Sequence, residues 1–113
     1  MQKITIYYNP RCSKSRKALE ILQSKGISPE IIDYMKTPLA VEQLSQLRSH
    51  FALDEFVRTN EHVFKTLGLS LDNEESILQA MMKNPVLMQR PIIICKDKAV
   101  IGRPPEKVLE LLE

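Results

Sequence analysis

The chain has 113 residues, of which 43% are hydrophobic and 27% charged, as expected for one compact soluble protein with its own core. Its formal net charge of +2 is too small to indicate nucleic-acid binding by itself. No segment approaches the roughly 20 apolar residues that cross a bilayer, and the run Ile4 to Tyr8 is too short for a signal peptide, so a cytoplasmic protein is expected.

The first third of the sequence predicts a βαβ unit. Lys3 to Tyr8 is rich in β-branched and aromatic residues, which favours a strand. Apolar residues at helical spacing predict a helix over Ser13 to Lys25, which Gly26 ends. A second strand is predicted over Glu30 to Tyr34. Strands joined by one helix at this spacing pair in parallel through a right-handed crossover.

The middle of the chain, residues 37–88, predicts a helical insertion that packs against the βαβ unit. Gly68 and Asn84-Pro85 separate its segments. His50 and His62 are expected to face solvent, because no further ligand set at metal-binding spacing accompanies them. Three apolar stripes carry the prediction: Val41, Leu44 and Leu47; Phe56, Val57, Val63, Phe64 and Leu67; and Ile77, Leu78, Met81 and Met82.

The last part of the chain returns to strands. Pro91 to Cys95 and Ala99 to Ile101 predict two strands joined by a turn at Lys96-Asp97-Lys98. Pro104-Pro105 then opens a last helix, since proline is favoured in a first helical turn. The order β-α-β, helices, β-β-α predicts an α/β fold with a four-stranded mixed sheet.

Cys12 lies where the first predicted strand passes into the first helix. Unpaired N–H groups and the positive end of the helix dipole favour a thiolate at such a position. No acidic residue occurs between Met1 and Glu20. The pattern predicts a nucleophile that meets an anion, flanked by the cations Arg11, Lys14, Arg16 and Lys17.

The second cysteine stands in a different setting. Cys95 follows three isoleucines in a predicted strand, which favours a core position over a role as resolving thiol. A reducing compartment argues against a Cys12–Cys95 disulfide. Ser13 and Ser15 can cap the helix or hydrogen-bond the thiolate. Ser15 also occupies the second position of a Cys-x-x-Cys pattern, so an intramolecular dithiol cycle at this site is excluded.

Four short motifs are specific enough to indicate a family. They are Tyr8-Asn9-Pro10-Arg11-Cys12, Phe56-Val57-Arg58, Gln89-Arg90-Pro91-Ile92 and Gly102-Arg103-Pro104-Pro105. Together they resemble the glutaredoxin-coupled arsenate reductase family, ArsC, of the thioredoxin-like superfamily. The resemblance spans essentially the whole chain and implies one thioredoxin-like domain over residues 1–113 with a helical insertion at 37–88.

The resemblance also implies roles. Cys12 would attack the arsenic of arsenate, while Arg58, Arg90 and Arg103 would bind the oxyanion. Planar guanidinium groups suit this task, because they hold such oxygens through paired, charge-assisted hydrogen bonds. Glutathione would then attack the arsenic adduct, and glutaredoxin would resolve the resulting mixed disulfide. The protein would need no metal and no bound cofactor, and it is expected to be a monomer. Supporting positions would be Tyr8, Asn9, Arg11, Ser13, Ser15, Arg16 and Pro91, the last in the cis form.

Two local features depart from the usual family pattern. Tyr8 stands where members often carry histidine, and a phenol supplies no imidazolium charge near neutral pH, although it can donate a hydrogen bond. The run from Arg11 to Ser15 resembles a subgroup found outside dedicated arsenic-resistance systems. This resemblance implies that the substrate in the cell is either arsenate or a similar small oxyanion, and that it need not be arsenate itself.

Two other functions are compatible with the same fold. Spx-type regulators bind RNA polymerase and commonly sense oxidation through Cys-x-x-Cys, which Ser15 precludes here. A glutaredoxin-like thiol oxidoreductase needs only one cysteine and would act on glutathione mixed disulfides. A low-molecular-weight phosphatase is disfavoured, because its Cys-x5-Arg spacing would require arginine at Ala18.

Overall fold

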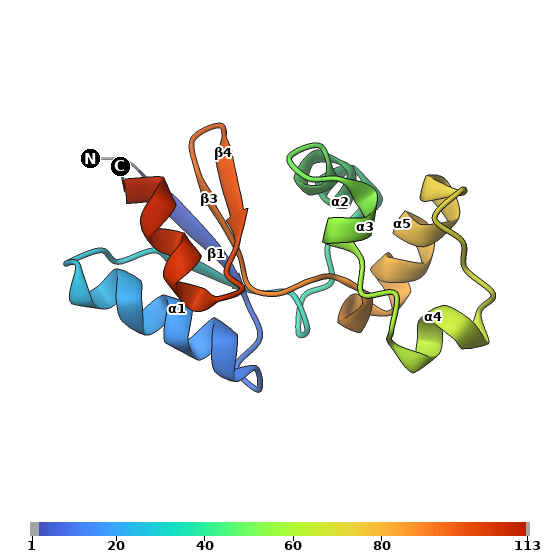
Figure 1. Ribbon diagram of the computed structural model, residues 1–113, viewed down its shortest axis with the longest axis horizontal. Coiled ribbons are helices and arrows are strands. Elements are labelled where there is room, and N and C mark those ends of the chain that lie inside the picture. The colour runs from blue at the N-terminus through green and yellow to red at the C-terminus, as the bar shows by residue number, and fades with distance from the viewer. Residues whose placement is uncertain (1–2, 113) are drawn as a thin grey trace. The chain divides into compact units, whose positions relative to one another are not determined.

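The computed structural model describes residues 3–112, which divide into two compact units. One unit combines the described residues up to Tyr34 with those from Arg90 onward. The other unit is the continuous segment Met35–Gln89, whose bounds lie close to those of the predicted insertion (Figure 1).

The first unit contains the four predicted strands, which are β1 (Ile4–Tyr8), β2 (Glu30–Asp33), β3 (Ile92–Cys95) and β4 (Lys98–Ile101). They form one sheet in the order β2-β1-β3-β4. The pair β1 and β2 is parallel, and the other two pairs are antiparallel. The predicted α/β class and four-stranded mixed sheet are therefore confirmed.

Strand register determines which chain segments meet at each end of this sheet. Tyr7 of β1 is opposite Ile92 of β3, and Ile92 is opposite Ile101 of β4. The carboxyl ends of β1 and β4 therefore lie beside the amino end of β3. At the other end of the sheet, Cys95 is opposite Ile4 and Lys98.

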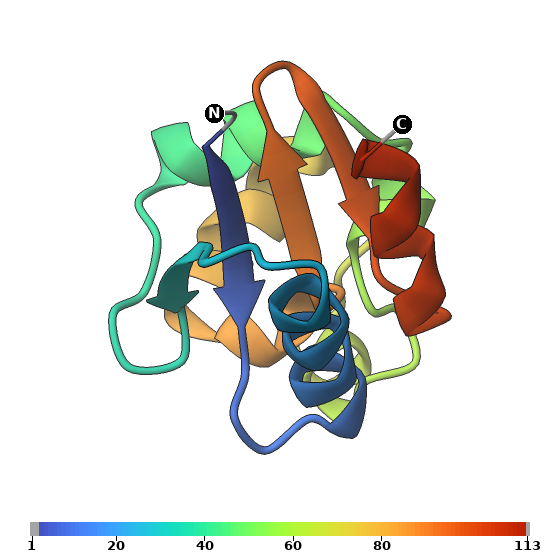
Figure 2. The same ribbon diagram turned by 90° about the vertical axis from the view of Figure 1, so that its left-hand side faces the viewer.

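Two helices cover one face of the sheet, and Figure 2 shows them side by side. They are α1 (Ser13–Ser24) and η2 (Pro105–Leu112). Their buried side chains form a core with those of the central strands. That cluster is Ile4, Ile6, Ala18, Leu22, Ile93, Cys95, Val108 and Leu111. The core position predicted for Cys95 is therefore confirmed, since its side chain is only 3% exposed.

The predicted last helix is present but is a 3-10 helix rather than an α-helix. It still places Val108 and Leu111 three residues apart on its buried side, as the tighter 3-10 repeat requires. The β3–β4 hairpin turns at Lys96, which has a φ of 59°. Left-handed backbone of this kind is typical of tight hairpins.

The second unit holds four α-helices and a short 3-10 helix within the part of the chain that is described. They are α2 (Val41–Arg48), α3 (Leu53–Phe56), α4 (His62–Thr66), α5 (Glu74–Lys83) and η1 (Pro85–Leu87). The prediction that residues 37–88 are helical throughout is wrong around Val57, which forms a β-bridge with Met88. The second predicted stripe is accordingly split between α3 and α4, and its last member, Leu67, is 51% exposed.

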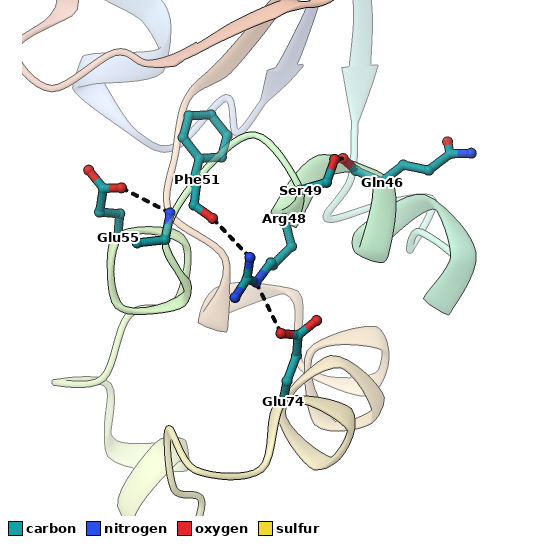
Figure 3. Close-up of polar contacts among 7 residues, drawn as sticks. Gln46, Arg48, Ser49, Phe51, Glu55 and Glu74 are labelled. Carbon is teal, nitrogen blue, oxygen red and sulfur yellow. Dashed lines mark hydrogen bonds and ion pairs between the residues drawn. The ribbon is translucent and has the colours of Figure 1, made fainter.

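Polar contacts fix the ends of these helices (Figure 3). Arg48, at the end of α2, pairs with Glu74 of α5 through Nε and Oε1, 3.1 Å apart, and its Nη1 donates to the carbonyl of Phe51. Glu55 accepts a hydrogen bond from the N–H of Ala52 at the start of α3. Because Arg48 joins two helices and a loop carbonyl, it ties together segments far apart in the sequence.

Both histidines of the second unit are exposed, as predicted. Among residues 3–112, none of the helices has the length and apolar character needed to span a bilayer.

Candidate active site at Cys12

Cys12 is the N-cap residue of α1, directly after the loop that follows β1. The loop is fixed by two hydrogen bonds to Asn9, which is itself buried. Its carbonyl accepts from the N–H of Cys12 at 2.9 Å, and its side-chain Oδ1 accepts from the N–H of Arg11 at 2.9 Å. The thiol is therefore held in place by backbone contacts and has only 8% of its surface exposed.

Several groups act on the Cys12 sulfur. Burial raises the pKa of the thiol, but hydrogen bonds from the N–H of Ser15, the guanidinium of Arg90, the hydroxyl of Ser15 and the N–H of Lys14 lower it, from 9.0 to about 7. These donors stabilise the charged form, which outweighs the cost of desolvating it. Cys12 is consequently a thiolate in a large fraction of molecules near neutral pH.

The hydroxyl of Ser15 has a defined direction. Ser15 is fully buried, and its Oγ accepts a hydrogen bond from the N–H of Asn9 at 3.4 Å. Because that contact uses a lone pair, the single hydroxyl proton remains available for the sulfur of Cys12. Asn9 and Ser15 thus belong to the surroundings of the thiol, where the sequence predicts them.

Arg90 and Arg103 approach the same end of the sheet, because they flank the adjoining ends of β3 and β4. The Nε of Arg103 donates to the carbonyl of Arg90 at 3.0 Å. In the Arg90 side chain, Nε and Nη1 are buried and have no hydrogen-bond partner among the described residues. Buried guanidinium donors of this kind are suited to a ligand that carries oxygen atoms.

Pro91 and Pro104 follow these arginines, and both peptide bonds, Arg90–Pro91 and Arg103–Pro104, are cis. The cis form expected at Pro91 from the family resemblance is therefore present. Pro91 is buried at the start of β3, next to the arginine that acts on Cys12.

Arg58, the third arginine in the prediction, belongs to the second unit. Its N–H donates to the carbonyl of Leu87 at 2.7 Å, and its Nη2 lies 3.9 Å from Oε2 of Glu61. The side chain is 16% exposed. Its part in binding the same anion as Arg90 stays a prediction.

The other predicted residues differ in their surroundings. Tyr8 is half-buried and packs against the core of the first unit. Arg11, Ser13 and Arg16 are exposed, and Nη1 of Arg16 donates to the carbonyl of Pro10 at 3.1 Å. The unpaired N–H groups that the sequence predicts at this helix start are those of Lys14 and Ser15, which both lower the pKa of Cys12.

A cavity of about 810 Å³ lies at the opposite end of the sheet, between the start of β1 and residues 26–30. None of the predicted site residues lines it. Cavity size therefore does not identify the site, which is defined by the thiol and the arginines.

The first unit has the element order β-α-β…β-β-α around one mixed sheet. It carries a low-pKa thiol at a helix N-terminus and a cis-proline at the start of the neighbouring strand. These features together define a thioredoxin-like thiol protein. Comparison with known proteins narrows this class. The chain belongs to the ArsC family, whose model matches residues 7–111. The family resemblance carried by the four motifs is confirmed.

Individual relatives support the assignment over the whole length. The chain is 40% identical over 114 residues to an arsenate reductase of Haemophilus influenzae, covering 96% of this chain and 98% of the relative. It is 43% identical over 116 residues to the Escherichia coli K12 protein YfgD, which is described as uncharacterized, covering 98% of each. The structure of an arsenate reductase from Vibrio cholerae matches with a TM-score of 0.90 at 38% identity, covering 97% of this chain and 98% of that one.

Proposed function

We propose that this protein reduces arsenate to arsenite, with the Cys12 thiolate as nucleophile and Arg58, Arg90 and Arg103 as ligands of the oxyanion. The observation that carries the proposal is the pairing of a thiol of pKa about 7 with an arginine whose buried Nε and Nη1 have no partner among the described residues. Membership of the ArsC family and relatives named arsenate reductases support the choice of arsenate.

In the first step the Cys12 sulfur attacks arsenic(V). A sulfur–arsenic bond forms, and one arsenate oxygen leaves as water after taking up two protons. Guanidinium groups favour this step, because they balance the negative charge on the remaining oxygens while the anionic sulfur approaches. The positive end of α1 acts in the same direction.

The second step needs an external thiol. Glutathione attacks the cysteine-bound arsenic adduct, and a disulfide forms between Cys12 and glutathione. The sulfur–arsenic bond breaks with its electron pair on arsenic, which leaves as arsenite. Two thiols are thereby oxidised by one electron each, and arsenic gains two.

Glutaredoxin completes the cycle when its thiolate attacks the glutathione sulfur and releases the thiolate of Cys12. Ser15 supports this external route, because a serine at this position cannot form a disulfide with Cys12. The cycle uses neither a metal nor a bound cofactor, and a monomer in the reducing cytoplasm would suffice for it.

A coupled assay tests the proposal. Purified protein is mixed with arsenate, glutathione, glutaredoxin, glutathione reductase and NADPH, and arsenate-dependent loss of NADPH is followed. We expect turnover that saturates with arsenate and requires both glutathione and glutaredoxin. No arsenate-dependent consumption above background would contradict the proposal.

Two parallel assays separate the competing functions. Activity on a glutathione mixed disulfide without arsenate turnover would indicate a glutaredoxin-like oxidoreductase. Capture of purified RNA polymerase without arsenate turnover would indicate an Spx-like regulator. Phosphate should also be tested as an inhibitor that competes with arsenate, since a second tetrahedral oxyanion reports on the binding site alone.

A further inference from the structure

The loop that follows β4 is bound to the main chain at the start of β3. The N–H of Gly102 donates to the carbonyl of Pro91 at 2.8 Å, and Nε of Arg103 donates to the carbonyl of Arg90 at 3.0 Å. Two successive residues after β4 are therefore hydrogen-bonded to two successive residues before β3. The placement of Arg103 relative to Arg90 depends on this contact.

Gly102 is the closest point of the contact. Its φ lies outside the left-handed region, so other residues could adopt its backbone conformation. Space is what excludes them. A Cβ at this position would lie 2.8 Å from Cγ of Pro91 and 3.4 Å from Cδ1 of Ile93, and the first distance is shorter than carbon atoms tolerate.

The Pro91 ring cannot swing away from such a Cβ. Its Cγ belongs to a ring closed on the main-chain nitrogen, so a change of ring pucker is the only movement open to it unless the backbone shifts. A side chain at Gly102 would therefore push apart the two main-chain segments. That movement would displace the Arg90 carbonyl, which anchors Arg103, and the Arg90 side chain, which acts on Cys12.

We propose that Gly102 is a positioning residue of the oxyanion site, whose missing side chain lets the residue 102–103 loop lie against Pro91 and so sets the placement of Arg90 and Arg103. The part concerning arsenate rests on the proposed function. The part concerning Arg90 and Cys12 does not require turnover and is tested separately.

The test compares Gly102→Ala with Gly26→Ala. Gly26 lies in the same unit and has a φ of +76°, with nothing within 4 Å of its hypothetical Cβ, so alanine there strains the backbone without displacing neighbours.

Three quantities are measured for each variant: KM for arsenate, the pH midpoint of Cys12 alkylation by iodoacetamide, and Tm. We expect Gly102→Ala to raise KM at least about tenfold and to raise the alkylation midpoint. Gly26→Ala should lower Tm alone.

A double variant keeps the proposal testable if Gly102→Ala is too unstable. Pro91→Ala removes Cγ, the atom in closest approach. Gly102→Ala should then raise KM and the alkylation midpoint much less in the Pro91→Ala background than in the wild type. Equal increases in KM and in the midpoint in the two backgrounds would overturn the steric mechanism.

The two proposals fail in different ways. If the wild type does not turn over arsenate, the proposed function fails, while the alkylation midpoints still decide whether Gly102 positions Arg90. If the wild type does turn over arsenate, and Gly102→Ala changes only Tm, the positioning role is overturned.

Discussion

The two cysteines lie toward opposite ends of one sheet, and their surroundings differ in kind. Cys12 follows β1 at a helix N-terminus, where main-chain N–H groups, a serine hydroxyl and a guanidinium act on its sulfur. Cys95 ends β3 in the apolar core, with Ile4 opposite it. Both are buried, at 8% and 3% exposure, so burial does not distinguish them. At Cys12, the donor groups offset the cost of burying a thiolate and lower the pKa of the thiol to about 7.

The largest expected effect is that of Cys12→Ser on turnover. We expect arsenate reduction to fall by more than about a thousandfold, since a serine hydroxyl is hardly ionised near neutral pH and cannot form the disulfide. The coupled assay measures this loss. Cys95→Ser is the matched control and should stay within about twofold of the wild type, because its side chain lies in the core. Loss of activity in the Cys95 variant alone would reverse the assignment of the two thiols.

Arg90→Lys should have the next largest effect. The charge is retained, but the planar pair of donors is lost, so we expect KM for arsenate to rise about ten- to hundredfold. The pKa of Cys12 should also rise, because the Arg90 guanidinium lowers it. Arg48→Lys in the second unit is a suitable control, since its guanidinium serves an ion pair with Glu74. Equal KM values for the two variants would argue against Arg90 as a ligand.

Ser15→Ala tests a smaller contribution to the same sulfur. Removing the hydroxyl should raise the pKa of Cys12, because that hydroxyl is one of the groups that lower it. Alkylation of Cys12 at pH 6 to 7 should slow several-fold and recover at high pH. Ser24→Ala, at the exposed end of α1, should leave the profile unchanged. An unshifted midpoint in Ser15→Ala would assign the low pKa to the remaining donors.

The pH dependence of stability gives a further test of the thiolate. Because folding lowers the pKa of Cys12 from 9.0 to about 7, the folded state loses its proton first as pH rises. Between these values the unfolded chain binds more protons, so the stabilising contribution of Cys12 grows with pH, is complete above about pH 9 and is lost as pH falls through about 7. The stability of the wild type relative to Cys12→Ser should therefore increase from pH 6 to 9. A constant difference would mean that folding does not lower this pKa.

The smallest effect on activity is expected for Cys95, where the change is in stability. Cys95→Ser places a hydroxyl in the apolar core and should cost about 1–3 kcal/mol of unfolding free energy. Denaturant unfolding measures this cost, and Cys95→Ala separates loss of packing from burial of the hydroxyl. If the serine variant were less stable than the alanine variant and equally active, Cys95 would be a packing residue only.

Local sequence patterns were sufficient for the elements of the first unit. Alternating apolar residues predict β1, helical spacing predicts α1, and Gly26 marks its end, because each signal acts within a few residues. The second unit was harder. Val57 belongs to an apolar stripe by composition, yet it pairs with Met88, thirty-one residues away, through a β-bridge. A pairing over that separation is set by tertiary contacts, which override helix preference.

The candidate site likewise has features that local sequence predicts and features that depend on distant contacts. Cys12 could be found from its place between a strand and a cationic helix start, whereas Arg58, Arg90 and Arg103 needed the family motifs, because isolated arginines are usually solvated. The bond from Arg103 to the Arg90 carbonyl and the contact of Gly102 with Pro91 depend on the register of β3 and β4. No local pattern encodes that register at the level of individual atoms.

The most direct test of the account is the state of Cys12 after a reaction stopped before its last step. Protein is incubated with arsenate and glutathione without glutaredoxin, and each cysteine is examined by mass spectrometry of its peptide. The account predicts one glutathione per chain, in disulfide linkage to Cys12, that accumulates only when arsenate is present and disappears when glutaredoxin is added. An adduct on Cys95, an adduct independent of arsenate, or no adduct during arsenate turnover would contradict it.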